Sequence, residues 1–545
     1  MGYRVLFSEL VLYNLNTLQN KFNIQSAYLR GNLFLCDMYK KTGNELPSFL
    51  NGEFSFVLFD EKNDRYFCTR DPLGIKALYF TKYNKEYIFS SSIEDLLKLP
   101  DFIKKPNLNA ISSIINQHTI EYAETMYENI FRLPPGHFML IENGKELIER
   151  YWFPEKIKIN YTITENESST KLKNLLSKAI NKRVTNFSET AFEVSGGLDS
   201  SSIVSLFAQK DIADTIDTYS MDFNDLKCDE GEYVDSILEK YPLDHQKVPA
   251  SNLDYQHTYA LKNLYELSPN WPIALTFAMS MPMLKKMQSD GKKVVISGQG
   301  GDHLFTGSPY VLYDLFRRFK FLSLCKELSY YSKRWSVFKS YVVKPLLGDK
   351  NIQLIKRLLT PNNIVSIKKQ GKSILNLSQK TNIKNPTFLS DLDALTSAGQ
   401  SAIMDSAFFH CAENYYGIEY RHPFFDIDLV EFSLSLPPEM KYKRRTIKWI
   451  LRKAMDGILP DKIRDRKDKA EFSEVLIQQI DTIDLHELLD NAFIVKLGII
   501  ESKEINKYIQ EYENKTVNYI STLWIIINVE YWYRYNFERE SLSLD

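Results

Sequence analysis

The sequence predicts an α/β protein in two parts: a β-rich (α+β) part, then a part built on a parallel sheet with a helical C-terminal portion. Short apolar runs separated by turn residues fill residues 1–160, which is typical of antiparallel strands. Beyond residue 168, strand-length apolar runs alternate with amphipathic helical segments, as in a parallel sheet with crossover helices. Because 545 residues exceed what one core usually holds, we expect two domains, 1–160 and 168–545.

In the first part, the apolar run Phe54–Phe59 and the run Arg65–Thr69 flank a polar segment and predict a hairpin. The following sequence Asp71–Gly74 (DPLG) has turn chemistry. Further elements of this part are strands over residues 77–80, 87–89 and 138–141 and a helix over residues 91–98.

A polar stretch, residues 160–170, is expected to separate the two parts. The segments after it alternate in type. We expect helices over residues 170–184, 200–210 and 232–240, strands over residues 191–194, 215–221 and 293–296, and mostly helix beyond residue 306.

Composition excludes several functional classes. A net charge of −1 predicts no nucleic-acid partner. Five widely spaced cysteines indicate a reducing cytoplasm and no metal-ligand pattern. The first ten residues lack the apolar run of a signal peptide, and no apolar stretch is long enough to span a membrane.

The strongest motif is the string 195–202 (SGGLDSSS), which follows a predicted strand and opens a predicted helix. Two glycines let successive backbone N–H groups face an anion, and the helix N-terminus and two hydroxyls add donors. A carboxylate in such a cradle suits Mg²⁺ bound to phosphates. The alternative is a glycine turn with a capped helix. The expected phosphate-binding residues are Ser195, Gly196, Gly197, Asp199 and Ser200.

A second motif, residues 294–302 (VVISGQGGD), again runs from an apolar strand into a glycine loop. Loops at the carboxyl ends of parallel strands meet in one crevice. Asp302 is therefore expected to face Asp199 and to supply a second carboxylate for Mg²⁺.

With these strings, residues 168–475 resemble the synthetase domain of the asparagine synthetase family, an ATP-pyrophosphatase fold of the adenine nucleotide α-hydrolase type. The segment 421–426 (RHPFFD) and residues 448–460 also resemble that family. The resemblance implies that ATP adenylates a carboxylate, which an amine then attacks. It further implies that adenine packs on Met221, that Asp199 and Asp302 bind Mg²⁺, and that the nucleotide also contacts Ser297, Gly298 and Gly300.

The charged string 466–472 (RKDKAEF) has two interpretations. Charge runs are usually solvated surface, and we expect this of Arg464, Arg466 and Lys467. Lys469, however, falls where the family has an essential lysine, so the resemblance implies a catalytic role for it. Asp426, after the helix-breaking Pro423, is interpreted as a helix cap.

Residues 26–141 resemble the family's N-terminal-nucleophile glutaminase domain, on the strings 51–56 (NGEFSF) and 70–74 (RDPLG). Such a glutaminase needs cysteine as its first mature residue, where this chain has Gly2. Cys36 and Cys68 are interpreted as buried thiols. We therefore expect a degenerate glutaminase-like domain and no use of glutamine.

Three features resemble lasso-peptide cyclases within this family: Gln299, where asparagine synthetases have Glu, and the strings 417–421 and 466–472. This resemblance implies macrolactam closure of a precursor peptide, with a leader-recognition protein and a leader protease as further partners. The alternatives are an asparagine synthetase using external ammonia, a β-lactam synthetase, and a non-catalytic scaffold or binding protein.

Overall fold

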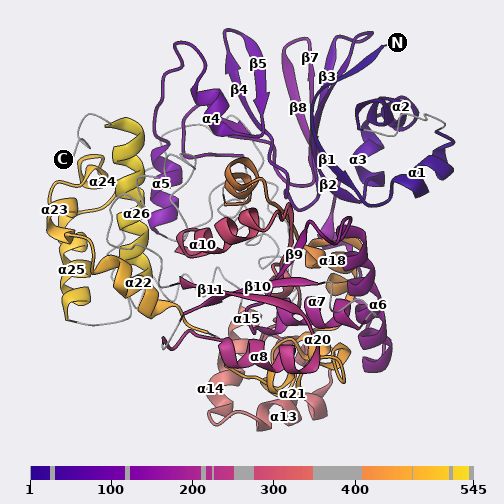
Figure 1. Ribbon diagram of the computed structural model, residues 1–545, viewed down its shortest axis with the longest axis vertical. Helices are drawn as coiled ribbons and strands as arrows, with labels where there is room; N and C mark the ends of the chain where they lie inside the picture. The colour runs from indigo at the N-terminus through magenta and orange to yellow at the C-terminus, as the bar shows by residue number, and fades with distance from the viewer. Residues whose placement is uncertain are drawn as a thin grey trace.

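The computed structural model describes residues 2–24, 31–116, 123–209, 216–223, 226–250, 275–347, 408–468, 470–514 and 520–538. Within these ranges the chain forms three β-sheets, two antiparallel and one parallel (Figure 1). The architecture is therefore α/β, with an antiparallel N-terminal part, a parallel-sheet part and a helical C-terminal part, as the sequence predicts.

The first antiparallel sheet has the strand order β1-β2-β3-β7-β8. Its strands are β1 (Tyr3–Leu12), β2 (Gly52–Asp60), β3 (Arg65–Arg70), β7 (His137–Glu142) and β8 (Lys145–Arg150). Three helices, α1 (Leu15–Phe22), α2 (Asn32–Thr42) and α3 (Leu46–Phe49), contribute to the core on one face.

The second antiparallel sheet, ordered β5-β4-β6, packs on the other face of the first through a small apolar core. Its strands are β4 (Tyr79–Tyr83), β5 (Glu86–Ser90) and β6 (Phe131–Arg132). Helices α4 (Ile93–Leu97) and α5 (Leu108–Ile115) follow it. The turn after β3 is built on Asp71, whose carboxylate accepts backbone N–H groups of Leu73, Ile75 and Lys76.

The parallel sheet has the order β11-β10-β9-β12-β13. Its strands are β9 (Thr190–Glu193), β10 (Asp217–Asp222), β11 (Asp244–Pro249), β12 (Val294–Ile296) and β13 (Glu419–Arg421). The chain runs outward from β9 in one direction and returns to its other side at β12, which makes the β9–β12 edge a topological switch point where ligands bind.

Each face of the parallel sheet has its own core, and helices lie on both sides of the sheet (Figure 1). Helices α6 (Glu165–Arg183), α7 (Leu198–Ala208) and α8 (Gly231–Lys240) cover one face. Helix α10 (Leu275–Ser289) and a helix over residues 408–416 cover the other. We call these the α7 face and the α10 face.

The remaining chain is mostly helical. Its first helices are α11 (Gly301–Phe305), α12 (Val311–Arg317), α13 (Phe321–Ser329), α14 (Arg334–Phe338) and α15 (Lys344–Leu347). Later come α18 (Ile427–Ser435), α19 (Pro438–Lys441), α20 (Trp449–Ala454), α21 (Asp461–Arg464), α22 (Ser473–Ile480), α23 (Leu485–Leu489), α24 (Phe493–Lys496), α25 (Ser502–Glu513) and α26 (Ile520–Phe537).

The last helices do not join the parallel-sheet cores. They share a core with α4, α5 and neighbouring residues of the N-terminal part, and α26 lies beside α5 (Figure 1). Trp532 of α26 is fully buried, with its ring edge-on to Tyr127 at a centroid distance of 5.5 Å. The helical segments of the N-terminal part and the last helices therefore form one packed unit.

Most predicted strands and helices match observed ones. The polar stretch over residues 160–170, however, contains the start of a helix. Helix α6 already begins at Glu165, because Thr164 and Glu167 form a reciprocal capping box. The polar stretch that was expected to separate the two parts is therefore helical from Glu165 onward. Strands β1, β6, β8, β11 and β13 were not predicted.

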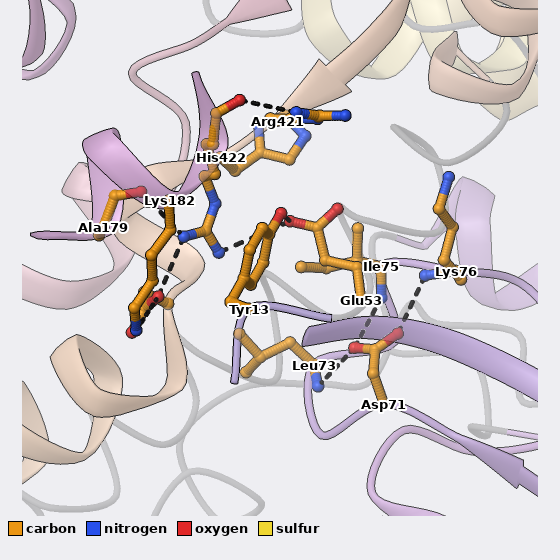
Figure 2. Close-up of polar contacts among 12 residues, drawn as sticks. Tyr13, Glu53, Asp71, Leu73, Ile75, Lys76, Ala179, Lys182, Arg421 and His422 are labelled. Carbon is orange, nitrogen blue, oxygen red and sulfur yellow. Dashed lines mark hydrogen bonds and ion pairs between the residues drawn. The ribbon is translucent and has the colours of Figure 1, made fainter. Parts of the chain in front are cut away.

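A largely buried polar cluster joins the N-terminal part to the parallel-sheet part, and we call Tyr13, Glu53, Arg183 and Asp426 the interface cluster. Figure 2 labels Tyr13 and Glu53 of this cluster. The Arg183 guanidinium lies 3.0 Å from Asp426 Oδ2 and 3.6 Å from Glu53 Oε1. The Tyr13 hydroxyl donates to Glu53 Oε1 at 2.9 Å. Its ring centroid lies 4.2 Å from Arg183 Cζ. Since both carboxylates share one buried cation, the cluster fixes the two parts together.

A membrane-spanning helix is not found in the part of the chain that the structure describes.

Candidate active site

A cavity of about 540 Å³ opens at the carboxyl ends of β9, β10 and β12. Both predicted glycine loops contribute to its wall, as does the predicted adenine-packing residue at the end of β10. The wall includes Ser195, Gly197, Asp199, Ser200, Met221, Ser297, Gly298 and Asp302. The structure thus brings these predicted residues together.

Hydroxyl groups hold the first loop in shape. The Ser195 backbone N–H donates to Ser200 Oγ at 3.1 Å, and the two serine hydroxyls lie 3.0 Å apart. Gly196 takes a positive φ of 72° at this turn, which glycine adopts without strain. Helix α7 then starts at Leu198 without a side-chain cap, so its first N–H groups suit an anion in the cavity.

The two loops touch where glycine leaves room. A Cβ on Gly298 would lie 2.5 Å from the Ser200 backbone nitrogen, and a Cβ on Gly301 would lie 2.3 Å from Asp199 Cγ. Any larger residue would push the loops apart. The second glycine loop is therefore needed to bring Asp302 near Asp199.

Lys448, just before α20, lies between these two carboxylates. Its Nζ donates to Asp199 Oδ2 at 2.5 Å and lies 2.8 Å from Asp302 Oδ1. Burial acts to lower the pKa of Lys448, but the two carboxylates outweigh burial and raise the pKa. The lysine is therefore charged. We call Lys448, Asp199 and Asp302 the site cluster.

The geometry of the site cluster bears on whether these residues can hold a divalent cation. One ammonium nitrogen reaches both carboxylates, so the two aspartates converge on a single cation position beside the phosphate loop. Carboxylate oxygens are the ligands that Mg²⁺ prefers, together with phosphate oxygens and water. The residues present therefore fit Mg²⁺ at this position.

Further cationic side chains line the same end of the cavity: Arg452, Arg466 and Lys467. The Arg466 side chain is only 8% exposed and is ion-paired with Glu230. The expectation that Arg466 is surface was therefore wrong, because the Glu230 carboxylate and the Tyr233 ring hold it in the wall. Arg464 does lie in an exposed network with aspartates.

Lys467 is exposed but also lines the cavity, so it is not an inert surface position. Lys469 lies outside the described residues. Its neighbours Asp468 and Ala470 both line the cavity, so the chain on either side of Lys469 runs along the wall. The catalytic role of Lys469 stays a prediction.

The opposite end of the cavity is apolar and aromatic, formed by Tyr219, Met221, Met283, Phe408, Phe409 and Tyr420. Glu193 also lies at this end, and its Oε1 accepts a hydrogen bond from the Tyr420 hydroxyl at 2.6 Å. Burial raises the pKa of Glu193 to about 7. A carboxylic acid that titrates near neutrality in a cavity is a candidate functional group.

Two predicted nucleotide-binding glycines are not in the cavity wall of the described structure, Gly196 and Gly300. Gly300 takes a positive φ of 99°, and a Cβ there would lie 2.9 Å from Phe424 and Phe425. The observed role of Gly300 is thus to let the loop pass the segment 423–425. Contact of Gly196 and Gly300 with a nucleotide stays a prediction.

The end of the segment 421–426 has the structural role that the sequence indicated, a helix cap at Asp426. Asp426 caps α18 by accepting the Asp428 backbone N–H at 3.2 Å. Its start supports the site, because His422 Nδ1 shares a hydrogen bond of 2.9 Å with the Ser297 hydroxyl. Burial lowers the pKa of His422 to about 3, so this imidazole is neutral and holds Ser297 in place.

Sequence reasoning did not identify Lys448, Arg466 or Glu193 as site residues. Lys448 lies within the segment 448–460, but no spacing rule links a lysine so far along the chain to the first loop. Glu193 carried a usable signal, since a lone acid between Phe192 and Val194 at the end of a buried strand is unusual.

A parallel sheet that holds two facing acidic glycine loops over one cavity has the features expected of a phosphate-binding site. The asparagine synthase family model matches residues 171–534, and a glutamine amidotransferase domain model matches residues 5–152. The chain belongs to the asparagine synthase family and is an ATP-dependent amide ligase of asparagine-synthetase-like type.

Named relatives are distant. Asparagine synthetase [glutamine-hydrolyzing] 3 of Bacillus subtilis is 25% identical over 482 residues, or 82% of this chain and 74% of the relative. A putative asparagine synthetase [glutamine-hydrolyzing] 2 of Methanocaldococcus jannaschii is 26% identical over 54% of this chain and 57% of the relative. A solved glutamine phosphoribosylpyrophosphate amidotransferase from B. subtilis is 14% identical over 35% of this chain and 39% of its own, with a TM-score of 0.19. That overlap is too small to bear on the fold.

Proposed function

We propose that this ligase closes a macrolactam in a precursor peptide: ATP adenylates a side-chain carboxylate, and the peptide's own N-terminal amine attacks it. The observation that carries the adenylation step is the convergence of Asp199 and Asp302 on one cation position beside the phosphate loop. The peptide substrate is inferred from short strings and from the chemistry of the N-terminal part.

The phosphate end of the cavity has the donors that adenylation needs. Ser195, Ser200 and the first N–H groups of α7 suit the β- and γ-phosphates. Lys448, Arg452 and Arg466 add positive charge around the departing pyrophosphate. Asp199 and Asp302 would hold Mg²⁺, which neutralises phosphate charge when bound.

The chemistry has two displacements. A substrate carboxylate oxygen bonds to the α-phosphorus of ATP, and the bond from that phosphorus to pyrophosphate breaks. The amine nitrogen then bonds to the acyl carbon, the acyl–oxygen bond breaks with its electron pair leaving on AMP, and the amine proton passes to solvent. Lys469 is proposed to stabilise the negative charge that develops in both transition states. Holding both reacting groups in one peptide makes the second step intramolecular.

The thiols of the N-terminal part support an amine source other than glutamine. A nucleophilic thiol needs a lowered pKa. Burial and Asp37 raise the pKa of Cys36, and burial raises the pKa of the fully buried Cys68. Among the N-terminal residues that the structure describes, these two are the cysteines present, and neither has an activated thiol.

The proposal of a peptide substrate rests on three features of the sequence that resemble lasso-peptide cyclases. Gln299 lines the cavity where asparagine synthetases have Glu, and the strings 417–421 and 466–472 lie on β13 and along the cavity wall. A leader-recognition protein and a leader protease are proposed as partners that deliver the trimmed precursor.

The test uses the purified full chain with ATP, Mg²⁺ and candidate precursor peptides encoded near its gene, with the proposed partners added. The expected product weighs one water less than the linear core peptide and appears together with AMP and pyrophosphate. N-terminal acetylation of the same peptide is the matched control and should stop ring closure.

Other outcomes replace the proposal. Conversion of aspartate and ammonia to asparagine, with all peptides ignored, would make the chain an asparagine synthetase with external ammonia. Closure of a small amino-acid-derived ring would make it a β-lactam synthetase. A failure to bind ATP would contradict adenylation itself and favour a scaffold protein.

A further inference from the structure

The cavity crosses the carboxyl edge of the parallel sheet from one face to the other. Its cationic end belongs to the α7 face, where α7, α11 and α20 pack in one core. Its aromatic end belongs to the α10 face, where Tyr219, Met283 and Tyr420 pack in the other core. A ligand that fills the cavity therefore needs an anionic end and a flat apolar end. A nucleoside triphosphate has both, with its base on the α10 face.

Glu193 lies on the base side of this edge. It is the last residue of β9 and pairs in register with Tyr219 of β10. Side chains alternate along a strand, so Glu193 points to the same face as Ala191, which belongs to the α10-face core. The phosphate loop begins two residues later and leads into α7 on the opposite face.

Glu193 also differs from the other acids of the cavity. Asp199 and Asp302 pair with Lys448, and Glu230 and Asp468 pair with Arg466. Within the described part of the chain, the hydrogen-bonding partner of the Glu193 carboxylate is the neutral Tyr420 hydroxyl, on Oε1. Its other oxygen is thus available to a hydrogen-bond donor from a ligand in the cavity.

We propose that Glu193, held by Tyr420, selects adenine by accepting a hydrogen bond from the exocyclic amino group of the base. This inference rests on one part of the proposed function, which is that a nucleotide binds in the cavity. Adenine presents an N–H donor at that position, whereas guanine presents a carbonyl oxygen that a carboxylate repels. Tyr420 keeps the carboxylate in one orientation by donating to Oε1, which leaves Oε2 for the amino group.

The surroundings favour the base over the ribose as the partner. Tyr219, Met283 and Phe409 give this end flat and polarizable walls, which suit stacking and thioether contacts with an aromatic ring. A buried hydrogen-bond acceptor among apolar walls fixes the orientation of a base that is otherwise held by apolar contacts. The pKa of Glu193, raised by burial to about 7, leaves the carboxylate form available at neutral and alkaline pH.

The test measures equilibrium binding to the full chain, with Mg²⁺ at pH 8 and no peptide. The ligands are ATP, GTP, 2′-deoxy-ATP, which lacks the ribose 2′-hydroxyl, and purine riboside triphosphate, which lacks only the amino group of the base. Wild type should bind purine riboside triphosphate about 10–100-fold more weakly than ATP, the range for a hydrogen bond to a charged group. In Glu193→Leu this difference should shrink to about twofold or less. Glu193→Gln, which offers an N–H donor, should narrow the preference for ATP over GTP.

Controls separate this inference from the proposed function. Glu232→Gln, an exposed acid on α8, should keep the wild-type preference, and melting curves show whether each variant folds. If wild type binds no nucleotide, the proposed function fails. If it binds ATP and purine riboside triphosphate equally, or if Glu193→Leu alters discrimination against 2′-deoxy-ATP instead, only the assignment of Glu193 to the amino group is overturned.

Discussion

The interface cluster and the site cluster use the same chemistry in two surroundings. Each has one cation between two carboxylates: Arg183 between Glu53 and Asp426, and Lys448 between Asp199 and Asp302. In the interface cluster the arginine and both carboxylates are sealed, with side chains 1–3% exposed. In the site cluster the carboxylates are 15% and 43% exposed.

The difference teaches what each cluster can do. A sealed cluster cannot exchange its cation, so its charges contribute to holding two parts of the chain together. An open cluster beside a phosphate loop can exchange a lysine contact for a metal or a phosphate without unfolding anything. Removal of one member should therefore impair function at the site and stability at the interface. The following experiments test that division, beginning with the largest effect.

The largest effect is expected from Asp199→Asn or Asp302→Asn. Each substitution removes a carboxylate from the proposed Mg²⁺ position, and metal charge stabilisation is worth several kcal/mol, so AMP formation should fall at least about 10³-fold. The melting temperature should change little, because Lys448 keeps one partner. AMP release in a coupled assay is the measurement.

The matched control for that prediction is Asp456→Asn, an aspartate whose side chain is 65% exposed in a surface network. It should leave AMP formation unchanged. Near-normal turnover by either site variant would show that the site cluster does not hold the metal.

Lys469→Ala should lower the rate of amide formation by about 10²–10³-fold, as when one transition-state donor is removed, with little change in melting temperature. Lys467 is a poor control because it also lines the cavity. Lys462→Ala is the better one, since that lysine lies on the surface beside Glu232. Equal losses from Lys462 and Lys469 would reduce this region to a generic basic patch.

Arg183→Met should act on stability. It leaves the buried Glu53 without its cation and Asp426 with only the partly exposed Lys182, and breaking a buried ion pair from one side costs about 3–5 kcal/mol. Urea unfolding measures the loss, and protein that remains folded should bind ATP normally. The neighbouring Lys182→Met is the control, because that side chain is 28% exposed and its ion pairs are worth about 1 kcal/mol or less. A similar loss from both variants would contradict the sealed character of the interface cluster.

Glu193→Gln should stabilise the protein at pH 8, with a smaller effect than the others. Burial raises the pKa of Glu193 from 4.5 to about 7. Because the pKa of Glu193 is raised in the folded protein, its contribution to the stability of the fold is complete below pH 4.5. That contribution is lost as the pH rises through 7, because the buried carboxyl group must then ionise. Tyr219 and Tyr420, which face it, have pKa values raised above 10 and stay neutral.

The expected gain of the glutamine variant over wild type is on the order of 3 kcal/mol at pH 8 and close to zero at pH 4.5. Urea midpoints at the two pH values measure it. A gain of equal size at both would mean that ionisation of Glu193 is not its cause.

The sequence predicts the parallel-sheet half well because its signals are local. Short strand-like runs mark β9, β10 and β12, and glycine strings follow the first and last of these. Because loops at the carboxyl ends of parallel strands lie in one crevice, Asp199 and Asp302 are predicted to lie close together. In the structure both contact Lys448.

The missed features depend on contacts between distant segments. Lys448 reaches Asp199 across 249 residues of sequence, and its left-handed backbone has no local signal. Arg466 is part of a charge run in the sequence, and only its ion pair with the distant Glu230 shows that its side chain is 8% exposed and lies in the cavity wall. Strand β13 has three residues, too few for a periodicity, and owes its form to pairing with β12.

The shared core of α5 and α26 has a consequence for how the chain is made. During synthesis the residues of the N-terminal part that belong to this core leave the ribosome long before α26, so their apolar side chains stay uncovered until residues 520–537 have been made. Such late, long-range closure slows folding and leaves apolar surface exposed meanwhile. We expect nascent chains stalled before residue 520 to bind chaperones, and chains that include α26 to be released from them.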